Sequence, residues 1–237
     1  MFVPTDDFIE YGTEVKEKIA KKWQSPNFYY HLRNGGHVSA LKKHIKHQHF
    51  IHLDIQNFFG QINRSRTTRC LKEYFSYTEA RNIAIKSTVR LPHSTIKKYI
   101  LPFGFVQSAI IASLCLHKST LGQHLHQLSH QNDLAVSVYM DDIIISSNSH
   151  QQLVEALEPV EVAANKAGFP LNKDKQEGPC EKISAFNIFL AHNELAVTSD
   201  RLSDFLSVFE ESSNEYQKNG ILNYVSCINT KQVALFE

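Results

Sequence analysis

The sequence contains few cysteines and no long hydrophobic run. Its four cysteines are widely separated among 237 residues and form no C-x-x-C pair. This argues against a cysteine-based zinc site and a disulfide scaffold, and favours a reducing, cytoplasmic setting. No apolar stretch approaches the roughly 18 residues of a membrane helix, and no basic segment followed by an apolar one opens the chain. We therefore expect a cytoplasmic protein with neither a secretion signal nor a membrane partner.

The net charge of +1 conceals an uneven distribution of charged residues. Residues 31–130 contain 14 Lys and Arg against 3 Asp and Glu, whereas residues 131–237 contain 7 against 16. Lys and Arg displace counterions from phosphates, so the basic block suits a polyanion such as nucleic acid. A solvated surface without a partner is the alternative. The overall composition, 42% hydrophobic and 21% charged, is that of one large globular domain or two small subdomains.

Apolar periodicity and turn residues divide the chain into helices and strands. The predicted helices cover residues 13–23, 64–90, 106–130, 150–167 and 201–216, with a basic connector or short helix at 42–49. The predicted strands cover residues 49–55 and the two halves of 134–147. Hairpins are expected at 27–41, around Asn34-Gly35-Gly36, and at 183–198, around His192-Asn193.

Three carboxylates lie where carboxylates are costly. Asp141 and Asp142 separate the apolar runs VSVYM and IIISS, and Asp54 is a lone acid in the apolar strand HFIHLDI. Buried carboxylates destabilise a fold unless a cation neutralises them. If the strands are neighbours, Asp54 and Asp141 together suit two Mg²⁺ ions, which activate a 3′-hydroxyl and stabilise a leaving pyrophosphate. The alternative is a solvent-facing pair of turn acids and a core Asp54 in a salt bridge.

These residues belong to a series of segments that resembles the motifs of reverse transcriptases. The segments are HLDIQNFFGQI (52–62), LPFGFVQSA (101–109), YMDD (139–142), AGFPLNKDKQ (167–176) and AFNIFL (185–190). Their order is that of the family. The compact format and the LDIxNFF style are similar to the bacterial group. The short region before the first motif and the lack of a maturase segment favour its defence-associated class, which includes abortive-infection and retron-like enzymes.

The resemblance implies an α+β, right-hand polymerase fold: fingers, a palm whose antiparallel sheet is backed by helices, and a much reduced thumb. The implied divisions are an N-terminal helix with short fingers (1–50), a palm with inserted fingers helices (51–182), a primer-grip-like hairpin (183–198), and a reduced thumb or tail (199–237). Because the thumb normally clamps the duplex, we expect a protein partner, an oligomer or a structured RNA to supply the missing grip.

The resemblance also assigns the catalytic residues. Asp54 and Asp141 would bind two Mg²⁺ ions, for which Mn²⁺ can substitute, with Asp142 in support and the Ile55 carbonyl as a further ligand. Lys175 would protonate the leaving pyrophosphate; a plain surface lysine is the alternative.

Further residues are assigned to the substrates. Phe59 would exclude a ribose 2′-hydroxyl and thereby disfavour RNA synthesis. The remaining nucleotide contacts would be Arg33 in the fingers hairpin, Gly104, Ser108 and Tyr139, and the template or primer contacts would be Phe103, Gln107 and Met140. Tyr139 would also touch the primer end.

Two substitutions depart from the family pattern. Phe103 stands where the family has glutamine, and Ala109 where it has proline. Phe103 can stack on a base or fill the core. The leading hypothesis is RNA-directed DNA synthesis from dNTPs, in antiphage defence, on a structured non-coding RNA template. Template-independent or protein-primed DNA synthesis is a second hypothesis. A catalytically idle RNA-binding scaffold is a third, against which the three acids argue.

Overall fold

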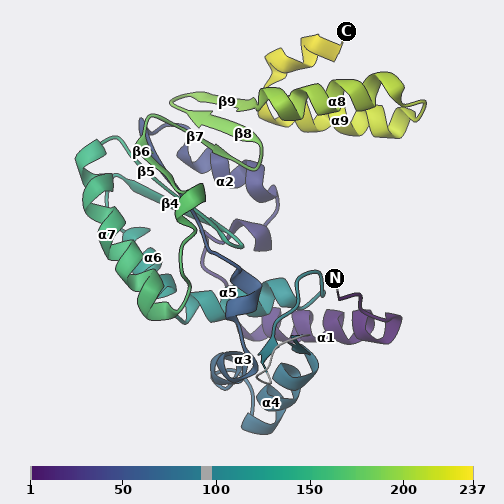
Figure 1. Cartoon of the computed structure of the whole chain (residues 1–237), viewed down its shortest axis with the longest axis vertical. Helices are drawn as coiled ribbons and strands as arrows, with labels where there is room; N and C mark the ends of the chain where they lie inside the picture. Colours follow the sequence, from purple (N-terminus) through teal and green to yellow (C-terminus); the bar gives the residue numbers. More distant parts are fainter. Residues whose placement is uncertain (1, 92–97, 237) are drawn as a thin grey trace.

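The computed structural model describes residues 2–91 and 98–236 (Figure 1). Its helices are α1 (Asp6–Lys22), α2 (Gly36–His44), α3 (Arg64–Leu71), α4 (Tyr77–Lys86), α5 (Ser108–His117), α6 (Thr120–Leu128), α7 (His150–Ala167), α8 (Ser199–Glu211) and α9 (Glu215–Ile228). Its strands are β1 (His49–Asp54), β2 (Val89–Arg90), β3 (Tyr99–Ile100), β4 (Leu134–Tyr139), β5 (Asp142–Ser147), β6 (Glu177–Cys180), β7 (Lys182–Ala185), β8 (Ile188–Ala191) and β9 (Glu194–Val197). Short 3₁₀ helices are η1 (Tyr30–Leu32), η2 (Phe58–Gln61), η3 (Lys173–Lys175) and η4 (Thr230–Phe236).

An antiparallel sheet with the order β4-β5-β1-β6 forms the centre of the molecule. Strands β1, β4 and β5 are almost wholly buried, because both faces of the sheet are covered. This is why their sequences are nearly continuous apolar runs rather than alternating ones. In the register of β1 and β5, Ile51 lies opposite Ile145 and Asp54 lies opposite Asp142.

The two faces of this sheet belong to two hydrophobic cores. Ile51, Leu53 and Ile145 belong to the larger core, which α5, α6 and α7 share. Phe50 and Ile144 join the smaller core with α2, β7–β9 and the C-terminal helices. Side chains two residues apart on a strand share a face. Asp54 therefore lies on the same face as Phe50, toward α2 and the three-stranded sheet β7-β8-β9.

The segment predicted as a hairpin at 27–41 contains η1 and the start of α2 instead of two paired strands, so that prediction is wrong. Gly35 and Gly36 have positive φ values of 87° and 53°, but their turn leads into α2 rather than into a returning strand. Ala40, Leu41 and His44 are buried at helical spacing and place α2 on the sheet. The ring of His44 forms two hydrogen bonds, from Nδ1 to Ser146 Oγ at 2.6 Å and from Nε2 to Ser137 Oγ at 2.7 Å, with the donor set by the tautomer. These bonds anchor the helix to β5 and β4.

Several other predicted elements are correct in kind but differ in extent. The helical regions 64–90 and 106–130 are each broken in two, at the N-caps Ser76 and Ser119, whose hydroxyls accept from Glu79 N and Gly122 N. The 183–198 region adds a strand to the expected hairpin. The turn at His192-Asn193 joins β8 and β9, and a second turn precedes β8.

The C-terminal region holds more helix than the sequence predicts. The expected helix at 201–216 is α8, and α9 follows it as a second helix. The pair extends from the β7-β8-β9 sheet, at the opposite end of the molecule from α3 and α4 (Figure 1). None of the helices in residues 2–91 and 98–236 combines the length and apolar character that a bilayer crossing requires.

Candidate active site

The turn between β4 and β5 brings the acidic residues to one end of the two central strands. Tyr139 pairs with Asp142, so the turn consists of Met140 and Asp141. Ile55 N donates a hydrogen bond of 2.9 Å to the carbonyl of Asp141, which ties the turn to the end of β1. The structure therefore places Asp54, Asp141 and Asp142 together, although they are distant in sequence.

Asp54 is a buried carboxylate with a cationic partner. Only 6% of the residue is exposed, and its Oδ2 accepts from Lys175 Nζ at 3.2 Å. That hydrogen bond, reinforced by the charge of Asp54, raises the pKa of Lys175. Asn172 N donates to the Asp54 carbonyl at 2.8 Å, so the loop that carries Lys175 is anchored to β1 itself. The salt bridge that the sequence left as the alternative for Asp54 is therefore present, at the same end of the sheet as the acid pair.

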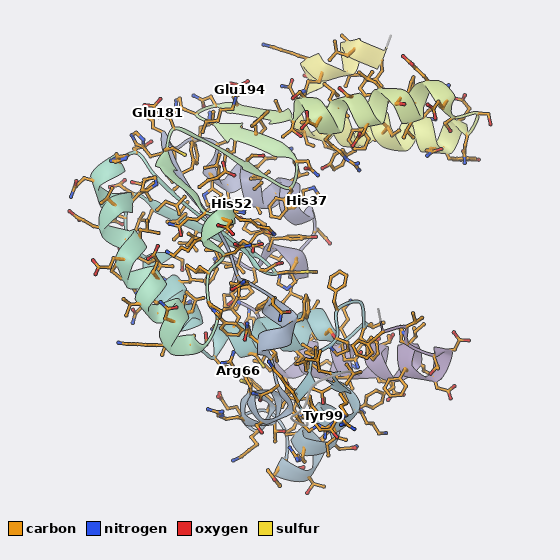
Figure 2. The ribbon with its side chains drawn as sticks, viewed as in Figure 1. His37, His52, Arg66, Tyr99, Glu181 and Glu194 are labelled. Carbon is orange, nitrogen blue, oxygen red and sulfur yellow. The ribbon has the colours of Figure 1, made fainter. Side chains whose placement is uncertain are left out.

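Asp142 has a different partner, His52. Its Oδ1 lies 2.8 Å from His52 Nε2, and Glu177 Oε1 lies 3.9 Å from the other ring nitrogen. Burial lowers the pKa of His52, but the hydrogen bond and charge of Asp142, with Glu177 and Asp54, outweigh burial and raise it. Figure 2 shows His52 in the middle of the molecule, over the central sheet. The sequence predicted no catalytic role for this histidine.

Asp141 is the member of the group whose charge is least compensated. Burial, followed by repulsion from Asp142, raises the pKa of its carboxyl group to about 6, and Asp54 adds to the effect while Lys175 opposes it. A carboxylate in this situation is stabilised by a cation. The three acids and the Ile55 carbonyl supply only oxygen donors, the set that hard divalent ions prefer.

The acids are not arranged as a ready-made metal site. In the part of the chain that the structure describes, no three His, Cys, Asp or Glu side chains are grouped so that they could hold an ion. Asp54 is turned to Lys175 and Asp142 to His52, so two of the three carboxylates are engaged by cationic or polarised groups. The donor chemistry fits a divalent ion. For an ion to bind, Lys175 must move away from Asp54 and His52 from Asp142.

Two adjacent phenylalanines separate into a core residue and an accessible one. Phe58 is 3% exposed and its ring lies 5.7 Å from that of Phe169. Phe59 is half-buried, and its ring meets the edge of Phe103 at 5.5 Å. Phe103 is 64% exposed, so it does not fill the core. Gly104 follows it with a φ of 89°, a conformation that glycine adopts without strain.

Gln107 and Ser108 lie in the interior. Gln107 is fully buried, and its amide donates to Ser87 Oγ at 3.3 Å. A Cβ on Gly12 of α1 would lie 2.4 Å from its Oε1, which shows how closely α1 approaches. Ser108 is 1% exposed, and among residues 2–91 and 98–236 its hydroxyl has no hydrogen-bond partner. Both residues contribute to helix packing in this structure. A contact of Gln107 with the template or primer and of Ser108 with the nucleotide therefore stay predictions.

An aromatic cluster surrounds Tyr139. Its ring meets those of His31 at 5.9 Å, His37 at 5.8 Å and Phe186 at 5.3 Å. His37 also lies 3.0 Å from the hydroxyl of Tyr224 on α9, which connects the C-terminal helices to the acidic turn. Figure 2 shows His37 near the start of α2. The sequence offered only the aromatic composition of residues 27–41 as a signal for this cluster.

A family model described as reverse transcriptase (RNA-dependent DNA polymerase) matches residues 11–184. The chain belongs to the reverse transcriptase family. Reverse transcriptase domains generally use divalent metal ions, in agreement with the donor set described above. None of the curated proteins matches the sequence.

Two solved structures of a viral reverse transcriptase are similar in fold to this chain, and a telomerase structure is also matched. A foamy viral protease-reverse transcriptase in complex with RNA/DNA hybrid has a TM-score of 0.52 and 15% identity over 81% of this chain and 23% of its own. The same viral protein, described as dRH and in complex with double-stranded DNA, has a TM-score of 0.50 and 16% identity over 81% and 29%. A telomerase from Candida albicans, in complex with a fragment of telomeric RNA, has a TM-score of 0.49 and 8% identity over 98% and 43%.

This chain thus spans about a quarter of the length of the two viral proteins, and the likeness to them concerns the fold. The predicted α+β polymerase fold is confirmed. The division of this reverse transcriptase into fingers, palm and thumb stays a prediction.

Arg33 of this reverse transcriptase is not part of a fingers hairpin, contrary to expectation. It follows η1, is exposed, donates to the carbonyl of Asn27 and lies over the ring of Tyr30 at 5.4 Å. With Lys16 of α1 it lines a cavity of about 500 Å³ beside α5. The residue remains a predicted triphosphate contact, but without the hairpin on which that prediction rested.

Proposed function

We propose that the protein is an RNA-directed DNA polymerase that joins dNTPs to a primer 3′-hydroxyl with two divalent ions, Mg²⁺ or in its place Mn²⁺. The observation that carries the proposal is the pairing of Asp54 with Asp142 across β1 and β5, with Asp141 in the adjoining turn. When bound, the ions would activate the hydroxyl and stabilise the charge of the leaving pyrophosphate.

The residues of the chain would divide the remaining work. Asp54 and Asp141 would hold the ions with the Ile55 carbonyl, and Asp142, oriented by His52, would support them. Lys175 has a raised pKa and is therefore protonated at neutral pH, as a proton donor to pyrophosphate must be.

The accessible aromatic residues would meet the substrates. Phe59 would lie against the sugar and exclude a 2′-hydroxyl. Phe103, which is largely exposed, would stack on a base of the template or nucleotide. Tyr139 and Met140, on the acidic turn, would contact the primer end. Nucleotide contacts by Gly104 would use its open backbone, since no atom of the described residues lies within 4 Å of a Cβ added there.

A primer-extension assay tests the proposal. Purified protein with a primed RNA template, dNTPs and Mg²⁺ or Mn²⁺ should extend the primer. The double change Asp141→Asn/Asp142→Asn should abolish extension, because metal ligands act together and are not replaced by amides. Asp133→Asn, an exposed acid outside the site, is the matched control. If the double variant folds and extends the primer as well as the wild type, Asp141 and Asp142 are not catalytic residues.

A second mode of synthesis is favoured by one residue. Phe103 replaces a template-region glutamine of the family pattern and projects into solvent, which suits stacking without base-specific hydrogen bonds. Template-independent or protein-primed DNA synthesis by the same acids is therefore our second candidate. Reactions that lack RNA template, and reactions that lack primer, distinguish the two modes. Incorporation that persists in either reaction supports the second.

The biological setting rests on sequence resemblance alone. The resemblance is to the defence-associated bacterial class, and we propose antiphage defence, a cytoplasmic location and a structured non-coding RNA as template. A protein partner or a second copy of the chain would add contacts with the duplex to those that α8 and α9 would make. Sequencing of the nucleic acid that copurifies with the protein tests the template, and an idle scaffold would yield RNA without a DNA product.

A further inference from the structure

The turn that carries Asp141 contains a backbone conformation that needs support. Met140, the first of its two residues, has a φ of 57°. A non-glycine residue in a sparsely populated backbone region of this kind is strained, and such strain persists only where the surroundings fix it. Asp141 is the next residue, so the conformation of Met140 decides where its carboxylate lies.

A hydrogen bond from outside the hairpin reaches this residue. Met140 N donates to Nδ1 of His31 at 3.2 Å. On the other side of the ring, His31 Nε2 lies 2.5 Å from Ser113 Oγ on α5. The Ser113 hydroxyl donates in turn to the carbonyl of Ala109 at 2.7 Å. A chain of hydrogen bonds therefore runs from the acidic turn to the body of α5.

The directions of these bonds are consistent with one form of the imidazole. A backbone amide only donates, so Nδ1 must accept and carry no proton. The Ser113 hydroxyl proton is committed to Ala109, so Nε2 must donate. Burial lowers the pKa of His31 to about 4, against a backbone hydrogen bond with Ala109. The ring is therefore neutral at pH 7, with a lone pair available on Nδ1.

The segment that carries His31 is itself fixed to the sheet. Tyr29, fully buried, forms a parallel bridge with Val138 of β4, and Val138 N donates to the Phe28 carbonyl at 2.8 Å. The ring of His31 also meets the edge of Tyr139. His31 is thus held between β4, α5 and the turn before any substrate binds.

We propose that His31 is a positioning residue, which fixes the strained amide of Met140 and thereby orients Asp141 toward Asp54 for metal binding; this inference rests on the proposed polymerase function. His31 touches neither the ions nor the reacting atoms in this role. It acts through the backbone of the turn, and α5 is the support against which it acts.

Selective labelling tests the contact without reference to activity. The sequence has two methionines, and Met1 is at the N-terminus, so ¹⁵N-methionine gives one backbone amide signal, from Met140. Its hydrogen exchange should accelerate about five- to tenfold in His31→Leu, because a net hydrogen bond is removed. His31→Asn retains an acceptor atom at the Nδ1 position and should keep most of the protection. His124→Leu, on α6, is the matched control and should leave the signal unchanged.

Kinetics tests the consequence for the reaction. His31→Leu should lower kcat about tenfold with the KM for dNTP changed less than twofold, and His31→Asn should restore most of kcat. If the role of His31 were merely structural, kcat would fall by the same factor in both variants. Equal protection of the Met140 amide in His31→Leu and wild type overturns the proposal, as does equal loss of kcat in the two variants. If wild-type protein incorporates no dNTP, the polymerase proposal fails, and the amide measurement still decides the His31 contact.

Discussion

Lys175 Nζ lies 3.2 Å from Asp54 Oδ2, although 63% of the Lys175 side chain is exposed and only 8% of the Asp54 side chain is. A solvent-facing cation thus neutralises a buried acid at the position proposed for a metal ligand. The ion pair is at the surface end of the sheet, so it is accessible to competition from ions in solution.

Lys175→Met should raise the affinity of the protein for Mn²⁺ by about 1.5- to 5-fold. The ion must displace the ammonium group from Asp54, and exposed ion pairs contribute about 0.2–1 kcal/mol. Titration calorimetry, in the absence of nucleic acid, measures the change. Lys173→Met is the control, because Lys173 pairs with Glu161 instead. Unchanged or weaker Mn²⁺ binding in Lys175→Met would contradict the competition.

Asp141 should make the metal-free protein less stable as the pH rises from about 4 to about 6. Its pKa is about 6 in the folded state against an ordinary value of 3.8. Over this range the folded state retains a proton that the unfolded chain releases, so the free energy of unfolding falls with pH. Asp141→Asn should therefore stabilise the protein at pH 7 by on the order of 1 kcal/mol, after allowance for solvent screening of a partly exposed group.

Urea unfolding in the presence of EDTA measures this effect. The difference between Asp141→Asn and wild type should become small at about pH 3.5 and disappear at lower pH, where Asp141 is protonated in both states. If the difference in the free energy of unfolding is the same at pH 3.5 and pH 7, its cause is packing and not the charge of Asp141.

Phe59→Ala should admit ribonucleotides. Removal of the ring opens space for a 2′-hydroxyl, and steric discrimination of one small group contributes about 1–3 kcal/mol, or about 10- to 200-fold. The ratio of kcat/KM for dNTP to that for rNTP measures it. Phe103→Ala is the control: it should weaken binding of both sugars alike, because stacking does not read the sugar. Sugar selectivity that survives Phe59→Ala would exclude Phe59 as the gate.

Gly122→Ala should destabilise the fold by about 1–3 kcal/mol, as overpacked cores do. A Cβ at Gly122 would lie 2.0 Å from the carbonyl oxygen of Leu116, where α6 turns back beside α5. Gly220→Ala is the contrasting control. In the part of the chain that the structure describes, no atom lies within 4 Å of its Cβ position in α9. Helix propensity alone should therefore stabilise the Gly220→Ala protein by up to about 1 kcal/mol. Thermal unfolding of both variants gives the comparison.

The acid-bearing strands could be predicted because burial leaves a direct trace in sequence. Strands β1, β4 and β5 are covered on both faces, so most of their residues are apolar, and Asp54 stands out as the lone acid of β1. The breaks within the predicted helices coincide with capping residues that are present in the sequence. Ser76 is followed three residues later by Glu79, a capping-box spacing that could have divided the predicted 64–90 region.

Other features could not be predicted because local sequence does not contain them. Asn34-Gly35-Gly36 suits a hairpin turn and a helix start equally well, and only the contacts of Leu41 and His44 with the sheet decide for the helix. The hydrogen-bond partners of His31 and His52 lie 82 to 109 residues away in the sequence. A histidine has the same sequence signature whether it orients a carboxylate, supports a turn or faces solvent.

The attachment of α2 to the sheet has a kinetic consequence. His44 is fully buried and joined to two strands, so residues 36–44 cannot swing over an incoming nucleotide as a hinged flap would. Loading of substrate should then show no slow phase from this segment in stopped-flow traces. Any closure that commits the nucleotide must come from elsewhere in the chain or from whatever binds beside it.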